Sequence, residues 1–194
     1  MSKDLQMKQV EQELVLFKKS PLYTYRIKNS YIPVIGEGNL DANIIFIGEA
    51  PGKSEALSGK PFCGASGKVL DQLLGHINTG RSGVYITNIV KDRPQENRDP
   101  TPDEIALYAP FLIRQLEIIK PKVIATLGRF SMQFVLKHFN LEKELDTISN
   151  IHGKIFKIKA PWGTVKIIPL YHPAVAVYNR KRFDELKCDI KKLL

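Results

Sequence analysis

Short apolar runs alternate along this chain with longer segments in which apolar residues recur at helical spacing. The runs predict strands, and the longer segments predict helices. In chain order we expect a strand at 43–48, a helix at about 66–76, a strand at 83–90, a helix at about 101–119, a strand at 122–127 and a helix at 129–139. Strands that alternate with helices favour a mainly parallel sheet covered on both faces. The pattern therefore predicts a three-layer α/β/α fold.

The two ends of the chain add further elements to this pattern. Leu5, Val10, Leu14 and Phe17 lie near helical spacing, so residues 1–18 are predicted to form an amphipathic helix that docks on the domain. We expect a loop from Pro21 to Asn39. After residue 150, the segments 153–159 and 164–171 predict a hairpin, and 180–193 predicts a closing helix. The whole chain, 1–194, is expected to be one domain.

One predicted helix has a clear start signal in the sequence. The segment Thr101-Pro102-Asp103-Glu104 offers a capping hydroxyl, a proline in the first turn and two acids near the positive end of the helix. We therefore expect the helix at about 101–119 to begin here.

Composition excludes several classes of protein. Hydrophobic residues make up 43% and charged residues 25% of the 194, as in ordinary globular domains. The longest apolar runs are too short to cross a bilayer, and the N-terminus lacks the apolar core of a signal peptide. Cys63 and Cys188 are the two cysteines and lie far apart in the sequence. We expect a cytoplasmic protein that needs no disulfide.

Positive charge gathers toward the C-terminus. The net charge is +9, and residues 151–194 contain ten Lys or Arg against three acids, which gives +7 for this segment alone. A polyanion such as DNA is a natural partner for such a surface, because phosphates neutralised by basic side chains release counterions. A solvated basic surface is the competing interpretation.

Polar and glycine-rich segments follow the ends of three predicted strands. Gly48-Glu49-Ala50-Pro51-Gly52 comes after the run 44–47, Asn88 follows the run 83–87, and His172-Pro173-Ala174 follows the run 165–171. In open α/β sheets, ligands bind at the carboxyl ends of the strands. These segments are therefore the candidate site.

The first of these segments invites comparison with a phosphate-binding loop. That motif has four residues between its first Gly and the Gly-Lys-Ser/Thr triplet, whereas here only three separate Gly48 from Gly52-Lys53-Ser54. Pro51 also removes a backbone donor, and we expect no helix to start at Lys53. The sequence therefore argues against nucleotide hydrolysis.

Four motifs taken together resemble the family 4 type of uracil-DNA glycosylase. They are GEAPG at 48–52, GKPFCGASG at 59–67, Thr87-Asn88 and His172-Pro173-Ala174. The resemblance covers roughly residues 14 to 190. It implies a monofunctional enzyme of base excision repair that hydrolyses the N-glycosidic bond of deoxyuridine in DNA and leaves an abasic site. It also implies base flipping, uracil-containing DNA as the partner, no cofactor and a monomer.

The resemblance assigns roles to the residues of these motifs. Breaking an N-glycosidic bond leaves positive charge on the sugar and negative charge on the base, which suits a carboxylate facing a histidine. Glu49 and His172 take these catalytic roles, and Glu55 assists or is a surface carboxylate. The uracil would stack on Phe62 and be read by the Asn88 amide. It would also lie against the first loop, at Gly48, Ala50, Pro51 and Gly52.

DNA contacts are expected on either side of this site. Lys53, together with Ser66 and Gly67 at a helix start, suits phosphates. The loop after His172 would enter the minor groove and fill the space left by the flipped base. Its expected contact residues are Pro173, Ala174, Val175, Val177 and Tyr178, with Arg180, Lys181 and Arg182 on the phosphates.

The chain departs from the family at the positions of an iron-sulfur cluster. Most family 4 enzymes carry four cluster cysteines, and the matching positions here hold Phe17, Ser20, Asp92 and Tyr108. None is a thiolate, so we predict no metal. Packing by Phe17 and Tyr108, with Asp92 paired to a nearby base, would hold this segment instead.

Two other functions remain open at this point. A relative without the cluster could bind uracil-containing DNA without catalysis. A related branch of the family traps uracil-DNA covalently, with an extra histidine-bearing basic loop and Gln at the position of Ala50. This chain has Ala50 and no such insertion, and Glu49, Phe62, Asn88 and His172 are present together, which favours catalysis.

Overall fold

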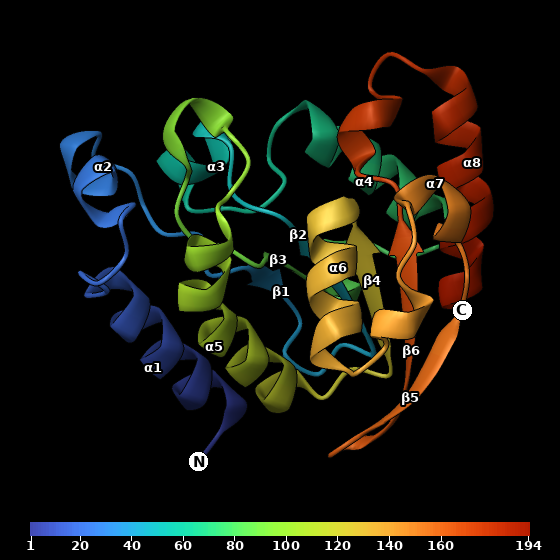
Figure 1. Ribbon diagram of the computed structural model, residues 1–194, viewed down its shortest axis with the longest axis horizontal. Coiled ribbons are helices and arrows are strands. Elements are labelled where there is room, and N and C mark those ends of the chain that lie inside the picture. Colours follow the sequence, from blue (N-terminus) through green and yellow to red (C-terminus); the bar gives the residue numbers. More distant parts are fainter.

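A computed structural model describes residues 1–194, which form one six-stranded sheet with helices on both faces (Figure 1). The strand order is β1-β3-β2-β4-β6-β5. The bounds are β1 Glu37–Gly38, β2 Ile44–Gly48, β3 Tyr85–Asn88, β4 Val123–Leu127, β5 Phe156–Ala160 and β6 Gly163–Leu170. The four central strands are parallel, and the two edge strands pair antiparallel. The predicted mainly parallel sheet and the predicted hairpin are confirmed.

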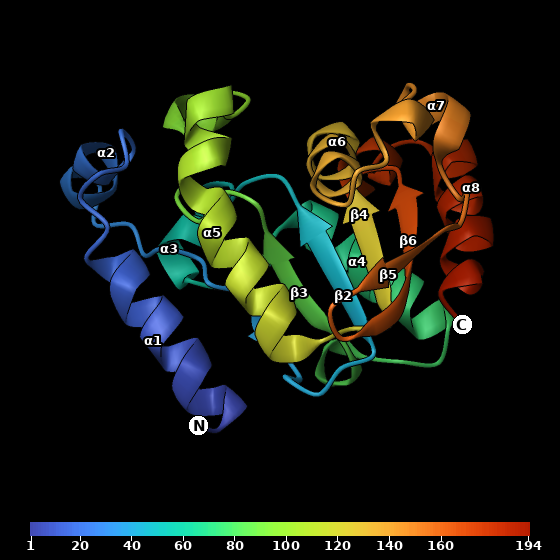
Figure 2. The ribbon, with the colours of Figure 1, turned by 60° about the horizontal axis from the view of Figure 1, so that its bottom comes forward.

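Eight α-helices surround this sheet (Figures 1 and 2). Their bounds are α1 Lys3–Val15, α2 Tyr23–Lys28, α3 Lys53–Ser58, α4 Ala65–His76, α5 Pro102–Ile119, α6 Arg129–His138, α7 Ile148–Ile151 and α8 Arg180–Ile190. Short 3-10 helices lie at Arg81–Gly83 (η1), Gln95–Asn97 (η2), Glu142–Glu144 (η3), Pro173–Ala176 (η4) and Lys191–Leu193 (η5). None of the helices has the length and hydropathy needed to cross a membrane.

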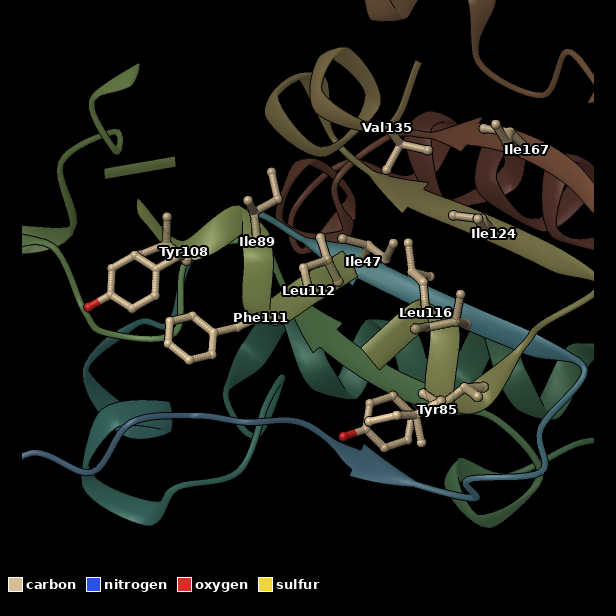
Figure 3. Packing of buried hydrophobic residues seen from close by; sticks show 14 of the residues in the cluster. Ile47, Tyr85, Ile89, Tyr108, Phe111, Leu112, Leu116, Ile124, Val135 and Ile167 are labelled. Carbon is tan, nitrogen blue, oxygen red and sulfur yellow. The ribbon is translucent and has the colours of Figure 1, made fainter. Parts of the chain in front are cut away.

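The three layers follow from alternation along the strands. Ile45 and Ile47 of β2 face a cluster formed with α1, α5 and α6, whereas Phe46 faces a cluster formed with α4 and α8. Because successive side chains of a strand point to opposite faces, each buried strand feeds both clusters. Figure 3 shows the first cluster, where Ile47 and Ile124 from the sheet meet Leu116 of α5. The predicted three-layer arrangement is confirmed.

The start of α5 is as the sequence indicates. The Thr101 hydroxyl accepts from the Glu104 backbone N–H at 3.2 Å, and the Glu104 carboxylate accepts from the Thr101 N–H at 2.8 Å. This reciprocal capping box satisfies two helix-end donors that would otherwise lack partners.

Several boundaries differ from the predictions. The expected loop from Pro21 to Asn39 contains the short α2 and β1, and α7 was not anticipated. The strand predicted at 83–90 is shorter, because η1 occupies residues 81–83. A helix does start at Lys53, with Gly52 as its N-cap, so the expectation that none would begin there was wrong. At six residues, α3 is too short to leave a clear periodic pattern.

The four residues that the resemblance places at the cluster positions lie together, three of them buried and Phe17 half-buried. The Tyr108 hydroxyl donates to Asp92 Oδ2 at 2.5 Å and lies 2.8 Å from Ser20 Oγ. Phe17 packs edge-on against Tyr108, with ring centroids 5.5 Å apart. A carboxylate and two hydroxyls that hydrogen-bond to one another beside a phenyl ring do not fit an iron-sulfur cluster, which takes thiolates.

The basic side chain that pairs with Asp92 is that of Arg26 in α2. Its Nη1 lies 3.1 Å from both Asp92 oxygens, and its guanidinium also donates to the carbonyls of Leu14 at 3.0 Å and Val15 at 2.7 Å. Burial raises the pKa of Asp92, and hydrogen bonds from Tyr108 and Arg26 offset part of that shift. The predicted pairing of Asp92 is confirmed, and it ties the end of α1 to α2, to the segment after β3 and to α5.

This buried pair generates a stability prediction. Replacing Asp92 by Ala leaves the Arg26 guanidinium buried without its carboxylate, which costs about 3–5 kcal/mol in the free energy of unfolding. The matched control is Glu13→Ala, which breaks the exposed pair of Glu13 with Arg114 and should cost less than about 1 kcal/mol. Urea unfolding measures both, and equal losses would contradict the clamping role of Asp92.

Candidate functional site

The carboxyl ends of β2 and β3 lie side by side and present the first two site segments together. Gly48 is the register partner of Asn88. The pairing runs on beyond the strands, since Ile89 N–H donates to the Gly48 carbonyl and Val90 N–H to the Glu49 carbonyl, both at 3.0 Å. The backbone that carries Glu49 is therefore held beside the backbone that carries Asn88.

The end of β6 brings His172 to the same edge of the sheet. Leu170 pairs with Leu127 of β4 and its carbonyl accepts from Gly128 N–H at 2.9 Å. His172 follows two residues later, and its Nδ1 accepts from the Ala174 backbone N–H at 3.2 Å. Because Nδ1 is an acceptor, the proton of the neutral ring is on Nε2. The loop therefore selects a tautomer that can donate from Nε2.

These strand ends surround a cavity of about 420 Å³. Its lining residues are Glu49, Ala50, Gly52, Glu55, Phe62, Ser66, Asn88, Asn97, His172 and Ala174. All but Asn97 belong to the site predicted from sequence. Gly48 and Pro51 do not line the cavity: Gly48 lies against Asn88 and Phe62, and Pro51 is buried.

Gly48 is required for two side chains to approach the strand end. A Cβ at this position would lie 2.2 Å from Asn88 Oδ1 and 2.7 Å from Phe62 Cζ. The Phe62 ring in turn lies 5.7 Å from the His172 ring, tilted by 33°. The ring, the amide and the imidazole therefore share one compact space that a methyl group on Gly48 would disrupt.

Phe62 has an unusual backbone conformation. Its φ is +50°, in the left-handed region that bulky residues rarely adopt. Such a conformation costs roughly 1–3 kcal/mol and persists where surrounding contacts enforce it, which is common at functional sites.

Asn88 is buried, and a buried lysine, Lys91, bonds its backbone carbonyl. Lys91 Nζ donates to the Asn88 carbonyl at 2.6 Å, to Thr87 Oγ1 at 2.6 Å and to Gln115 Oε1 at 2.5 Å. Three acceptors thus match the three donors of the ammonium group, although burial lowers the pKa of Lys91 well below its usual range. The backbone beneath the Asn88 amide is fixed by this cluster.

Glu49 has an environment that opposes its ionisation. Burial raises the pKa of this carboxyl to about 7, the Asp99 carboxylate adds to the rise, and Arg129 offsets part of it. Asp99 and Arg129 form an ion pair with each other. A carboxyl group with this pKa exchanges its proton near neutral pH, as expected of a group that handles water in a site.

His172 is shifted toward its neutral form. Burial lowers the pKa of His172 to about 4, and the Glu55 carboxylate offsets part of that shift. Glu55 is itself held by the Gly64 backbone N–H, which donates to Oε1 at 3.3 Å. At neutral pH the site therefore presents an uncharged imidazole.

The residues predicted to contact DNA lie mainly outside the cavity. The segment after His172 is η4, in which Val175 is 43% exposed, and Tyr178 just beyond η4 is 99% exposed. Pro173 is buried, Val177 is half-buried and Ala174 is exposed, whereas Lys53 is exposed at the start of α3. Gly67 is buried in the first turn of α4, which Gly64 rather than Ser66 caps.

The three basic residues at the start of α8 differ in how far their side chains are already bonded within the chain. Arg182 is engaged within the chain, because its Nη1 donates to the Tyr171 hydroxyl at 2.8 Å and to Glu185 at 2.7 Å. Arg180 is exposed and 3.7 Å from Asp184, and Lys181 is exposed. Arg180 and Lys181 are therefore better placed than Arg182 to meet a phosphate.

Three residues near the site were not assigned a role from the sequence. Asn97 lines the cavity and is held by Arg93, whose Nε donates to its Oδ1 at 2.7 Å. Asp99 and Arg129 set the charge around Glu49. Arg129 could have been found from its place just beyond β4, at the same edge of the sheet. Asn97 ends the single turn of η2 and Asp99 lies just after it, and one turn gives no periodic signal.

Comparison with known proteins agrees with this geometry. The sequence profile of the uracil DNA glycosylase superfamily matches residues 35–193. A type-4 uracil-DNA glycosylase of Archaeoglobus fulgidus is 44% identical over 185 residues, which are 95% of this chain and 89% of that protein. Another from Saccharolobus solfataricus is 43% identical over 177 residues, covering 91% of this chain and 79% of that protein. One from Thermotoga maritima is 41% identical over 148 residues, covering 76% of this chain and 72% of that protein. The profile match contains all six strands and the strand ends that form the cavity. The chain therefore belongs to the uracil-DNA glycosylase superfamily.

Proposed function

We propose that this protein removes uracil from DNA by hydrolysing the N-glycosidic bond of deoxyuridine, leaving an abasic site with the backbone uncut. The observation that carries the proposal is the meeting of Glu49, Phe62, Asn88 and His172 around one cavity of about 420 Å³. A site of this size suits a single flipped base rather than a duplex.

The base is held by a ring and an amide. Phe62 offers an aromatic face on which a pyrimidine stacks. The Asn88 amide can donate to O4 of uracil and accept from its N3–H, whereas cytosine presents the opposite pattern. Because Asn88 is buried on the Lys91 cluster, a cytosine in this place would leave buried polar groups unpaired, which is a strong basis for discrimination.

The departing base is stabilised by His172. As the bond to the sugar breaks, negative charge develops on the base and its O2 becomes a strong acceptor. A neutral imidazole with its proton on Nε2 can donate there, and the Ala174 N–H holds the ring in that tautomer. The low pKa of His172, about 4, keeps the ring uncharged at neutral pH.

The sugar side is served by Glu49. A carboxylate placed near the anomeric carbon stabilises the developing positive charge and orients a water molecule for attack. The raised pKa, about 7, also makes Glu49 able to accept a proton from that water at neutral pH. Glu55 accepts a hydrogen bond from the Gly64 N–H, and its carboxylate offsets part of the lowering of the His172 pKa.

The DNA duplex is met by the exposed segment after His172. Tyr178 and Val175 are exposed apolar side chains beside the cavity, as required of a wedge that fills the space left by a flipped base. Lys53, Ser66, Arg180 and Lys181 provide candidate phosphate contacts around it. Together with the positive charge of residues 151–194, this predicts binding that weakens steeply with salt.

The raised pKa of Glu49 predicts the pH dependence of the reaction. Only the ionised carboxylate is active, so the single-turnover rate should rise with pH up to about 7, falling about tenfold per unit below it. His172 stays neutral over this range and adds no further change. In Glu49→Gln the residual rate should be flat with pH. This variant should melt at or above the wild-type temperature at pH 8, since the fold disfavours the charged carboxylate there. A pH profile unchanged by the substitution would contradict the role of Glu49.

The packing at Gly48 predicts the effect of one methyl group. Gly48→Ala places a Cβ against Asn88 and Phe62, and displacement of these groups should lower the rate of uracil release roughly 100-fold or more. Gly75→Ala is the matched control, because a Cβ there meets nothing within 4 Å on α4, so activity should be kept and stability should rise slightly. If both variants keep full activity, the cavity does not take the base as proposed.

The function itself is tested by a single-turnover assay with a labelled oligonucleotide that contains one uracil. Alkali-dependent cleavage at that position, about 100-fold or more slower in His172→Ala, is the expected result. Cleavage without alkali would contradict the monofunctional reaction. Intact DNA bound by the protein would indicate a non-catalytic binding protein, and a complex that survives denaturant would indicate covalent trapping.

A further inference from the structure

The left-handed conformation of Phe62 needs an external restraint, because the segment that carries it has no regular secondary structure. Residues 60–64 lie between α3 and α4, and the φ of +50° at Phe62 is not one that a bulky side chain adopts without support. The orientation of the ring in the cavity depends on this backbone conformation.

Arg81 supplies the restraint from the beginning of η1. Its Nη1 donates to the Pro61 carbonyl at 3.0 Å, and its Nη2 donates to the Phe62 carbonyl. The planar guanidinium thus holds the carbonyl before Phe62 and the carbonyl of Phe62 itself. A guanidinium fixes such a pair by geometry as well as by charge, which an ammonium group cannot do.

Two carboxylates in turn hold the Arg81 guanidinium. Its Nε donates to Asp71 Oδ1 of α4 at 2.7 Å, and Nη1 also bonds Glu37 of β1. Arg81 therefore links the edge of the sheet and a helix to the loop of Phe62. Because Asp71 and Glu37 flank it, the positive charge of the guanidinium is offset by two carboxylates, and this cluster does not attract a DNA phosphate.

The Phe62 carbonyl also lies against the backbone of α4. A Cβ at Gly67 would lie 1.6 Å from the Phe62 oxygen. The carbonyl is therefore confined between the backbone of α4 and the Arg81 guanidinium. If the guanidinium is removed, the peptide can rotate away from α4, and the ring rotates with it.

We propose that Arg81 is a positioning residue that acts through Phe62, holding the aromatic ring where the flipped base stacks. Arg81 does not line the cavity, so it reaches the reaction only through the loop of Phe62. The inference rests on the proposed function in one respect, which is that Phe62 takes the base.

A double-mutant cycle on the single-turnover rate tests this role. Arg81→Met keeps an unbranched side chain but removes the guanidinium and with it both carbonyl bonds, and it should slow uracil release about tenfold, since small displacements of a positioning group cost this much or more. In a Phe62→Ala background the same change should have less than about a twofold effect, because the group through which Arg81 acts is gone. Arg81→Lys should rescue little, since an ammonium cannot hold both carbonyls.

The control and a binding measurement separate this role from others. Arg114→Met breaks an ion pair of comparable two-bond geometry with Glu13, on the α1–α5 side of the fold, and should leave the rate unchanged. Affinity for undamaged DNA, and its salt dependence, should be equal in Arg81→Met and the wild type. If Arg81→Met unfolds below the assay temperature, Arg81→Lys takes its place in the cycle, because it keeps a positive charge beside Asp71 and Glu37 but cannot hold both carbonyls.

The outcomes are distinct from failure of the proposed function. A wild-type protein with no uracil release would refute the function itself. An active wild type in which Arg81→Met costs as much with Ala at position 62 as with Phe would overturn the proposal, because Arg81 would then act independently of the ring. A lower salt dependence of DNA binding in Arg81→Met would also overturn it, by making Arg81 a phosphate contact.

Discussion

The register of the parallel strands is the constraint on which the site depends. Gly48 lies directly beside Asn88, and Leu170 lies beside Leu127, so the segments after β2, β3 and β6 leave the sheet at one edge. A shift of one residue would turn every side chain of a strand to the other face and separate Glu49 from Asn88. The alternation of Ile45, Phe46 and Ile47 between two apolar clusters holds that register against slippage. The core of the protein and the geometry of the site therefore have the same origin.

Much of this arrangement was predictable, because it follows from local patterns. Apolar runs located β2, β4 and β6, the segment 101–104 located the start of α5, and glycine and proline after the strands located the loops that carry Glu49 and His172. The rest depends on contacts between distant segments. Nothing near Arg81 in the sequence indicates that it bonds the carbonyl of Phe62, and nothing near Asn97 indicates that it lines the cavity. Short elements such as α2 and α3 escaped because one or two turns leave no period to detect.

Support for the cavity extends well beyond its lining. Asp92, buried between Arg26 and Tyr108, is followed by Arg93, which holds Asn97 in the cavity wall and contacts the Tyr31 hydroxyl at 2.6 Å. Helices α1 and α2 are thereby connected to the site through hydrogen bonds and packed rings. In this chain, side chains do the bracing at the positions where the family resemblance places a metal cluster. Lys91 beneath Asn88 and Arg81 behind Phe62 give the same kind of support to the two side chains that we propose hold the base.

We expect one cavity at the strand ends to take a single uracil between a ring, an amide and a neutral imidazole. A crystal structure of the protein with free uracil at neutral pH tests it most directly. The pyrimidine ring should stack on Phe62, with its O4 and N3 edge on the Asn88 amide and its O2 at hydrogen-bond distance from Nε2 of His172. Uracil bound away from Phe62, or facing Nδ1 of His172 with the Ala174 hydrogen bond broken, would contradict it.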